Sequence, residues 1–221
     1  RTGEGQYIDM SQWECAMALL PEGILQHTFN GREPERDGNR DPMMAPHGIF
    51  KCLDRPEKIA GNTIDQWIAI VCADDTDWGR LARAMGRPEL AADARFATLA
   101  ARKRNEDELE AIVTQWTSSR RAVEVERLLQ HAGVAAAIIA DNKHLSEEDA
   151  HIGARDYFVL RDHPEVGKRQ HAGMPWRFSR TATSVRAAAP VIGQDTDAIL
   201  EQLLDYSAGE IAKMRADGAL E

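Results

Sequence analysis

Two stretches without apolar periodicity divide this chain and set the main limit on its fold. Residues 31–46 are rich in Gly, Pro, Asn, Asp and Arg, and residues 161–194 are rich in Gly, Pro and His. Such composition is typical of long loops rather than helices or strands. The residues between the two stretches do carry apolar periodicity. We therefore expect a middle domain that the chain enters by a crossover loop and leaves by a returning linker.

The two ends of the chain have the pattern of an open α/β fold. Residues 7–10 predict a short strand, and Ser11 with Glu14 three positions later is typical of a capping box that starts a helix. A strand followed directly by a helix is the repeating unit of an α/β sheet. At the other end, residues 196–204 and 207–217 predict two short helices.

The middle of the chain mixes the helical and the strand period, which indicates an α+β domain. Apolar side chains at helical spacing alternate with short apolar runs. In chain order we expect an antiparallel strand pair at 48–53 and 66–71, helices that begin near Thr76, Asn105 and Val125, and strands at 134–140 and 157–160. The stretch between the first two strands reads as a polar connection.

The net charge of −9 argues against nucleic acid or an anionic membrane as the main partner, because both select basic surfaces. Basic residues do gather at 80–87, 102–104 and 120–121, where a polyanion could bind. Solvated helix faces are the more common explanation of such clusters, and we expect that here. No apolar run approaches the ~20 residues that a membrane-spanning helix needs, so we expect no membrane span.

The three cysteines, Cys15, Cys52 and Cys72, lie far apart in apolar surroundings. No Cys-x-x-Cys pair and no Cys/His spacing suits a metal ion, so we expect no metal site. Free buried thiols in an odd number fit a reducing compartment, which predicts a cytoplasmic location.

Most candidate acid–base residues have an ordinary structural explanation. His163 and His171 lie in the polar linker with no partner that the sequence identifies. Asp74, Asp75 and Asp77 could form a carboxylate cluster, yet acidic residues directly before a helix more often cap it.

Residues 38–50 are unusual for a simple linker. They contain two prolines, the pair Met43–Met44 and His47. Methionine is flexible and polarizable and suits adaptable binding surfaces. This loop is therefore a candidate lining of a binding pocket.

The opening residues RTGEGQYIDMS are similar to the RTGxGQxVDxS element of the family III (CaiB/BaiF-type) CoA-transferases. Further segments resemble that family in the same order along the whole chain. They are GN (38–39), APHGIFKC (45–52), WIAI-x-CADDTDW (67–78), GRPELAADARF (86–96), HPEVG (163–167), GMPWRFS (173–179) and IGQDTD (192–197).

The resemblance implies an α/β enzyme with a Rossmann-like large domain that binds CoA and a smaller α+β domain. Two such subunits would interlock as a homodimer. Residues 1–44 would then belong to the large domain and the crossover loop, 45–155 to the small domain, 156–189 to a returning linker and 190–221 to the large domain again. The chain starts at Arg1 without Met and opens at once on a motif, which predicts a piece of a longer protein.

The resemblance also implies the reaction: CoA moves from an acyl-CoA thioester to a carboxylic acid, with no bound cofactor. The family's nucleophile is an aspartate upstream of the position of Arg1, so we expect no catalytic residue in this chain and no activity from it alone. Within the substrate loop, the resemblance implies substrate-binding roles for Asn39, Asp41, Met43, Met44 and His47. Some members have glycines where this chain has residues 41–44.

Two alternatives remain open from the sequence. A related branch racemises 2-methylacyl-CoA thioesters, and one of its acids would fall near Asp74. The chain could also be a non-catalytic interaction subunit, since it lacks the family's nucleophile. Neither the acid nor the acyl-CoA that the protein uses follows from the sequence.

Overall fold

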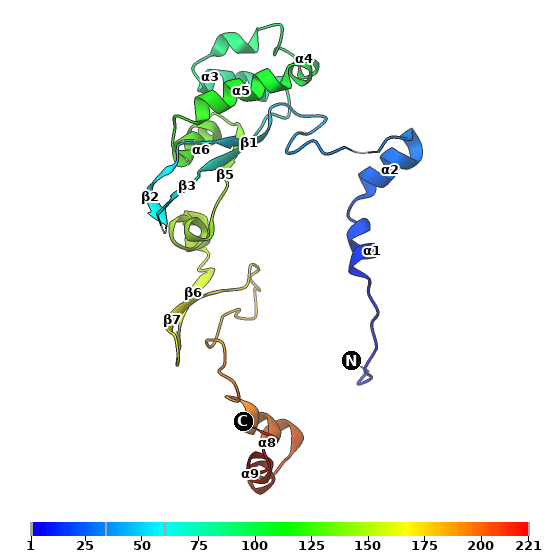
Figure 1. The fold of residues 1–221 in the computed structure, drawn as a ribbon, viewed down its shortest axis with the longest axis vertical. Coiled ribbons are helices and arrows are strands. Elements are labelled where there is room, and N and C mark those ends of the chain that lie inside the picture. The colour runs from blue at the N-terminus through cyan, green and yellow to red at the C-terminus, as the bar shows by residue number, and fades with distance from the viewer. Residues whose placement is uncertain (1, 34, 60, 221) are drawn as a thin grey trace. The chain divides into compact units, whose positions relative to one another are not determined.

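A computed structural model describes residues 2–33, 35–59 and 61–220 as a mixed α and β protein (Figure 1). The chain divides into two compact units, residues 1–139 and residues 140–221. Each unit is described by itself below. The domain boundaries expected from the sequence, after residues 44, 155 and 189, remain predictions.

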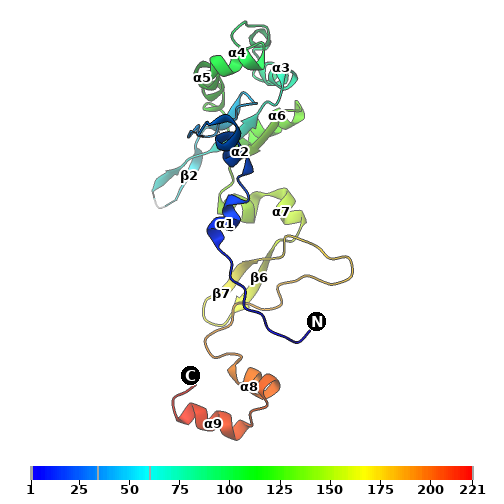
Figure 2. The same cartoon turned by 90° about the vertical axis from the view of Figure 1, so that its right-hand side faces the viewer.

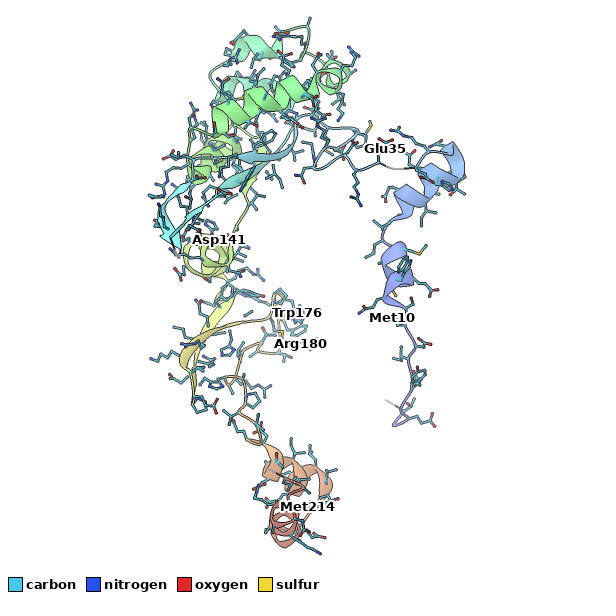
Figure 3. All side chains as sticks on the ribbon, in the orientation of Figure 1. Met10, Glu35, Asp141, Trp176, Arg180 and Met214 are labelled. Carbon is cyan, nitrogen blue, oxygen red and sulfur yellow. The ribbon has the colours of Figure 1, made fainter. Side chains whose placement is uncertain are left out.

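The first unit opens with two helices, α1 (Gln12–Met17) and α2 (Pro21–Asn30). Ser11 caps α1 as predicted, because its side chain accepts a hydrogen bond from the N–H of Glu14. The strand predicted at 7–10 is wrong, since this segment has no regular structure. A strand needs a neighbour for its backbone groups, and none pairs with it among the described residues. The apolar side chains of this segment are exposed. One of them is Met10, labelled in Figure 3, whose exposed fraction is 64%.

A three-stranded antiparallel sheet forms the centre of the first unit. Its order is β1 (His47–Lys51), β4 (Trp67–Val71) and β5 (Ala135–Ile138). The predicted pairing of the first two strands is confirmed, with Phe50 opposite Ile68. These two side chains and Ile70 are buried, because alternate residues of a strand face the same side.

A hairpin that the sequence did not predict fills the polar connection between β1 and β4. It consists of β2 (Arg55–Ile59) and β3 (Asn62–Ile64). Gly61 has φ +83°, a conformation that favours glycine, at the start of the returning strand.

Helices complete the core of the first unit (Figure 1). They are α3 (Asp75–Ala84), the 3₁₀ turn η1 (Pro88–Ala91), α4 (Leu99–Arg104), α5 (Glu106–Thr117) and α6 (Ala122–His131). Their buried apolar side chains form one cluster with those of the sheet, including Trp78, Leu81, Leu109, Val113, Val125 and Leu129. We assign most of the stability of the unit to the burial of this cluster.

Glycines end two of these helices, as the sequence predicts. Gly86 and Gly133 follow α3 and α6 with φ +76° and +75°. The N-cap predicted at Thr76 is wrong, because α3 begins two residues earlier and Asp74 caps it.

The second unit contains η2 (His144–Glu148), α7 (Ala150–Ala154), β6 (Phe158–His163), β7 (Gly167–Ala172), α8 (Thr196–Leu204) and α9 (Ala208–Ala216). Figure 2 shows β6 and β7 as a hairpin that lies within the expected linker 156–189. The capping box of α9 is confirmed, with Ser207 and Glu210 bonded in both directions.

Little of the second unit is buried. Among its described residues only Ile211 has a fully buried side chain, at 3% exposed. Figure 3 shows Trp176 and Arg180 on the irregular segment beyond β7. Across the described parts of the chain, every helix is too short or too polar to cross a membrane.

Candidate functional site

The candidate site is the loop of residues 37–46, which leads into β1 and is fastened to α4 and α5 by three cationic side chains. Arg40 makes the first attachment, to α5. Its Nε donates to Glu110 Oε1 at 2.9 Å and its Nη2 to Glu110 Oε2 at 2.6 Å, and Nη2 also pairs with Asp107. These carboxylates hold the pKa of Arg40 above its ordinary value. A forked arginine–carboxylate pair fixes orientation as well as distance.

Lys103 at the end of α4 makes the second attachment. Its Nζ donates to the backbone carbonyl of Asp41 at 3.0 Å and to Glu106 Oε2 at 2.6 Å. The Asp41 carboxylate turns back into the loop, where Oδ1 accepts from the N–H of Met43 at 2.7 Å. Asp41 therefore shapes the loop in this structure.

Arg102 makes the third attachment and is fully buried. Its Nε donates to the carbonyl of Ala45 at 2.6 Å and its Nη1 to the carbonyl of Phe96 at 3.0 Å. Its Nη2 lies 2.9 Å from Asp75 Oδ1, and the guanidinium carbon lies 5.9 Å from the centre of the Trp78 ring. The sequence-based assignment of 102–104 to a solvated helix face is wrong for Arg102.

Within the loop, His47 bonds back to Asn39. The two atoms are His47 Nδ1 and the carbonyl oxygen of Asn39, 2.5 Å apart. This contact closes the loop at the point where β1 begins.

A hollow of about 280 Å³ opens between the closed loop, β1 and α5. Asn39 and His47 line it together with Asp37 and Arg40 of the loop and with Glu110 and Thr114 of α5. Most of these lining groups are polar, so the hollow suits a small polar ligand.

The structure brings together only part of the predicted substrate-binding set. Asn39 and His47 share the hollow, whereas Asp41, Met43 and Met44 are not among its lining residues. Met43 is 68% exposed and Met44 is half-buried outside the core cluster.

Sequence reasoning missed Asp37, one position before the stretch it singled out, and also Glu110 and Thr114 of α5. Glu110 and Thr114 are four positions apart on α5, so they present to the same side of that helix. That spacing shows that the two polar groups share a face, but it does not show which loop the face meets.

Asp74, which caps α3, and Asp77 in its first turn serve the start of the helix. Asp74 Oδ1 accepts from the N–H of Asp77 at 2.8 Å, and Asp77 Oδ1 pairs with Arg80 Nη1 at 3.0 Å. This is the capping role, so the acid–base role considered for Asp74 gains no support. No cluster of His, Cys, Asp and Glu in the described part of the chain could hold a metal ion.

Comparisons with known proteins agree with the resemblance seen in the sequence. The family model described as CoA-transferase family III matches residues 1–196. Succinyl-CoA--D-citramalate CoA-transferase of Chloroflexus aurantiacus is 32% identical over 216 residues, which cover 98% of this chain and 51% of that protein. Succinyl-CoA:mesaconate CoA-transferase of Haloarcula marismortui is 28% identical over 91% of this chain and 48% of its own length.

A solved structure agrees as well. The crystal structure of a CAIB/BAIF family protein from Brucella suis matches with a TM-score of 0.72 and 26% identity, over 91% of this chain and 49% of that one. The chain thus spans about half the length of the curated relatives it matches. The match of the family model over most of the chain shows that it belongs to CoA-transferase family III.

Proposed function

We propose that this chain supplies the acid-binding part of an enzyme that moves CoA from an acyl-CoA thioester to a carboxylic acid. The observation that carries the proposal is the fastened loop with Asn39 and His47 over a polar hollow, in a chain of this family. The relatives support it by name, since they are CoA-transferases of succinyl-CoA with D-citramalate, L-malate or mesaconate.

The chemistry needs a nucleophile that we place on an aspartate outside residues 1–221. Its carboxylate attacks the thioester carbonyl, the C–S bond breaks, and CoA leaves as the thiolate with a mixed anhydride behind it. The thiolate then attacks the aspartyl carbonyl, releases the donor acid and leaves an aspartyl-CoA thioester. The acceptor acid repeats the two steps in reverse order and leaves as its CoA thioester.

The part of this chain in that reaction is to bind and orient the acid. Holding a carboxylate in the attacking position removes much of the entropic barrier to reaction. Asn39 and the backbone around it could donate to the carboxylate or to the oxygen on which negative charge develops. The attachments by Arg40, Lys103 and Arg102 keep the loop in one position for this task.

We further propose the family architecture for the intact protein. Residues 1–44 and 190–221 would belong to a Rossmann-like large domain, 45–155 to a small domain and 156–189 to a returning linker, in an interlocked cytoplasmic homodimer. Two observations support this division. Apolar side chains such as Trp13 and Phe29 are 78% and 79% exposed, and the second unit has almost no core of its own. Large exposed apolar surfaces normally lie against another part of a protein.

The test compares this chain with the intact protein that contains it. Both are incubated with succinyl-CoA and a panel of carboxylic acids, and the new thioesters are separated by chromatography. We expect transfer by the intact protein and none above the buffer rate by residues 1–221 alone. Turnover by this chain alone would place a nucleophile within it and contradict the proposal. An inactive intact protein would favour an interaction subunit.

A further inference from the structure

A second hollow, of about 430 Å³, lies entirely within the second unit. Its wall is formed by the corner between α7 and β6 and by the irregular segment that follows β7. Arg155 and Asp156 come from the corner, and Arg177 comes from the segment. Small-molecule sites usually have volumes of about 300–1,000 Å³, so the second hollow is large enough for a small ligand.

Hydrogen bonds to backbone carbonyls hold the corner and the segment together. Arg155 Nη2 donates to the carbonyl of Pro175 at 2.8 Å, and Arg177 Nη2 donates to the carbonyl of Arg155 at 2.7 Å. The N–H of Gly173 donates to the carbonyl of Tyr157 at 2.7 Å. A Cβ at position 173 would lie 2.8 Å from that same oxygen, so glycine is what permits the close approach. Specific contacts therefore form the second hollow.

The two arginines bring positive charge that the lining does not fully compensate. Neither forms an ion pair with a carboxylate in the described part of the chain, and each uses one of its five N–H donors on a carbonyl. One carboxylate, that of Asp156, lines the second hollow as well, which leaves one positive charge in excess. Residues 155–186 contain seven basic and three acidic residues, whereas the whole chain has a net charge of −9. An anion is the ligand that this local charge attracts.

The remaining side chains of the lining define the class of anion. Hydroxyl groups come from Thr181, Thr183 and Ser184, and apolar surface comes from Met174 and Phe178. A phosphate monoester carries a charge of about −1.5 to −2 at pH 7 and three strong acceptor oxygens. It can bond two guanidinium groups and a hydroxyl group at once, whereas a carboxylate has one charge and two oxygens to share among them. An organic group on the phosphate would then cover the apolar surface.

We propose that the second hollow binds a small phosphate monoester. Arg155 and Arg177 bind the phosphate oxygens, the hydroxyl groups complete their hydrogen bonds, and the organic part of the ligand lies against Met174 and Phe178. Two sources of this chemical group fit, a free phosphorylated metabolite and the phosphate monoester of CoA itself. The binding site does not depend on the proposed CoA transfer.

The variants compare arginines that line the second hollow with arginines that do not. Arg155→Gln combined with Arg177→Gln removes both guanidinium groups from the lining. The matched control combines Arg180→Gln with Arg186→Gln, which removes the same charge from exposed positions of the same segment outside the lining (Arg180 is labelled in Figure 3).

A third variant leaves the arginines in place. Arg155 and Arg177 also hold the wall together, so a loss of binding in their double variant alone could reflect a change of fold. Ala182 is exposed and lines the second hollow, so Ala182→Phe fills the space without removing any of these hydrogen bonds. A loss of binding in both variants requires the charge and the space together.

The measurement is titration calorimetry of the intact protein at an ionic strength of about 0.15 M, where the charges of distant arginines are screened. The probes are phenyl phosphate, phenyl sulfate, which has the same shape but one negative charge, and inorganic phosphate, which lacks the organic part. We expect phenyl phosphate to bind most tightly. Its Kd should rise about tenfold or more in the Arg155 and Arg177 double variant, because hydrogen bonds between charged groups are lost, and it should rise in Ala182→Phe as well. The control should change Kd by less than about twofold.

Three results would overturn the proposal: no binding of phenyl phosphate by the intact protein, equal losses in the two double variants, or unchanged binding in Ala182→Phe. Competition against bound phenyl phosphate distinguishes the two sources. CoA and dephospho-CoA differ only in the phosphate monoester, so displacement by CoA alone identifies that group as the ligand. Equal displacement by both, or by neither, identifies a free phosphorylated metabolite. An intact protein that binds phenyl phosphate but transfers no CoA would contradict the proposed function alone.

Discussion

Replacing Arg102 with Met should destabilise the first unit more than the same replacement of an exposed arginine does. Met has about the length of the arginine stem but cannot donate to a carbonyl. The change would leave the carbonyls of Ala45 and Phe96 without their donor, in residues that are both fully buried. It would also remove the cation from the Trp78 ring.

The size of the effect follows from these contacts. A buried polar group left without its partner costs about 1–3 kcal/mol, and two carbonyls are affected. A desolvated cation–π contact contributes up to about 2 kcal/mol. Relief from burying the guanidinium charge offsets part of this sum. We therefore expect a net loss of about 4 kcal/mol, which corresponds to a fall in Tm of roughly 8–16 °C for a unit of this size.

The assay is scanning calorimetry of the whole chain, with the transition of each unit resolved. Arg102→Lys keeps the positive charge and a donor group but loses the planar set of N–H groups of the guanidinium. Its Tm should therefore lie between those of the parent chain and Arg102→Met. The matched control is Arg104→Met, an exposed position two residues further on the same helix, where we expect a change within about 0.5 kcal/mol. The reasoning is refuted if Arg102→Met lowers Tm no more than Arg104→Met does.

Two further predictions concern the cysteines and the methionine pair. Burial raises the pKa of Cys52 to about 11 and that of Cys72 to about 12, so in the folded chain at pH 8 a thiol reagent should label the exposed Cys15 and spare the other two. Equal labelling of all three thiols would contradict this. The folded state also keeps Cys52 and Cys72 protonated at pH values where the unfolded state has released these protons, because the ordinary pKa of a thiol is near 9.0. The free energy of unfolding should therefore fall as the pH rises above that value. In the intact protein, Met43→Ala with Met44→Ala should change kcat/KM ratios among acyl donors and lower Tm little, whereas a large loss of stability with unchanged selectivity would show that they are core residues.

Local signals explain why most of the helical framework could be predicted from the sequence. Gly86 and Gly133 end helices because glycine adopts positive φ without a Cβ clash, and this preference depends on few distant contacts. The pair Ser207 and Glu210 starts α9 for a similar reason, since its hydrogen bonds join residues three apart.

The missed strands lack such signals. The β2–β3 hairpin and strand β7 are mostly polar and exposed, so no alternation of buried residues distinguishes them from loops. The strand predicted at 7–10 has the opposite problem. Its apolar composition favours a strand, but a strand forms only where a neighbour pairs with its backbone, and that depends on tertiary structure.

Some residues of the candidate site could also be predicted from the sequence, and others could not. Asn39 and His47 could be predicted because they lie in one short loop whose composition is unusual. Glu110 and Thr114 reach the hollow from a helix more than sixty positions further along the chain, and only the fold brings them there. Arg102 could not be told from its basic neighbours, because a cluster of basic residues does not show which of them the core encloses.

If this chain binds the acid while an aspartate elsewhere in the intact protein does the covalent chemistry, the covalent intermediate should be trapped on that aspartate. The intact protein is incubated with succinyl-CoA, the acyl or CoA adduct is trapped by reduction or with hydroxylamine, and the modified peptide is identified by mass spectrometry. We predict one modified aspartate, outside residues 1–221, and no modified residue within them. An adduct on a residue of this chain, or CoA transfer without any adduct on the protein, would contradict the account.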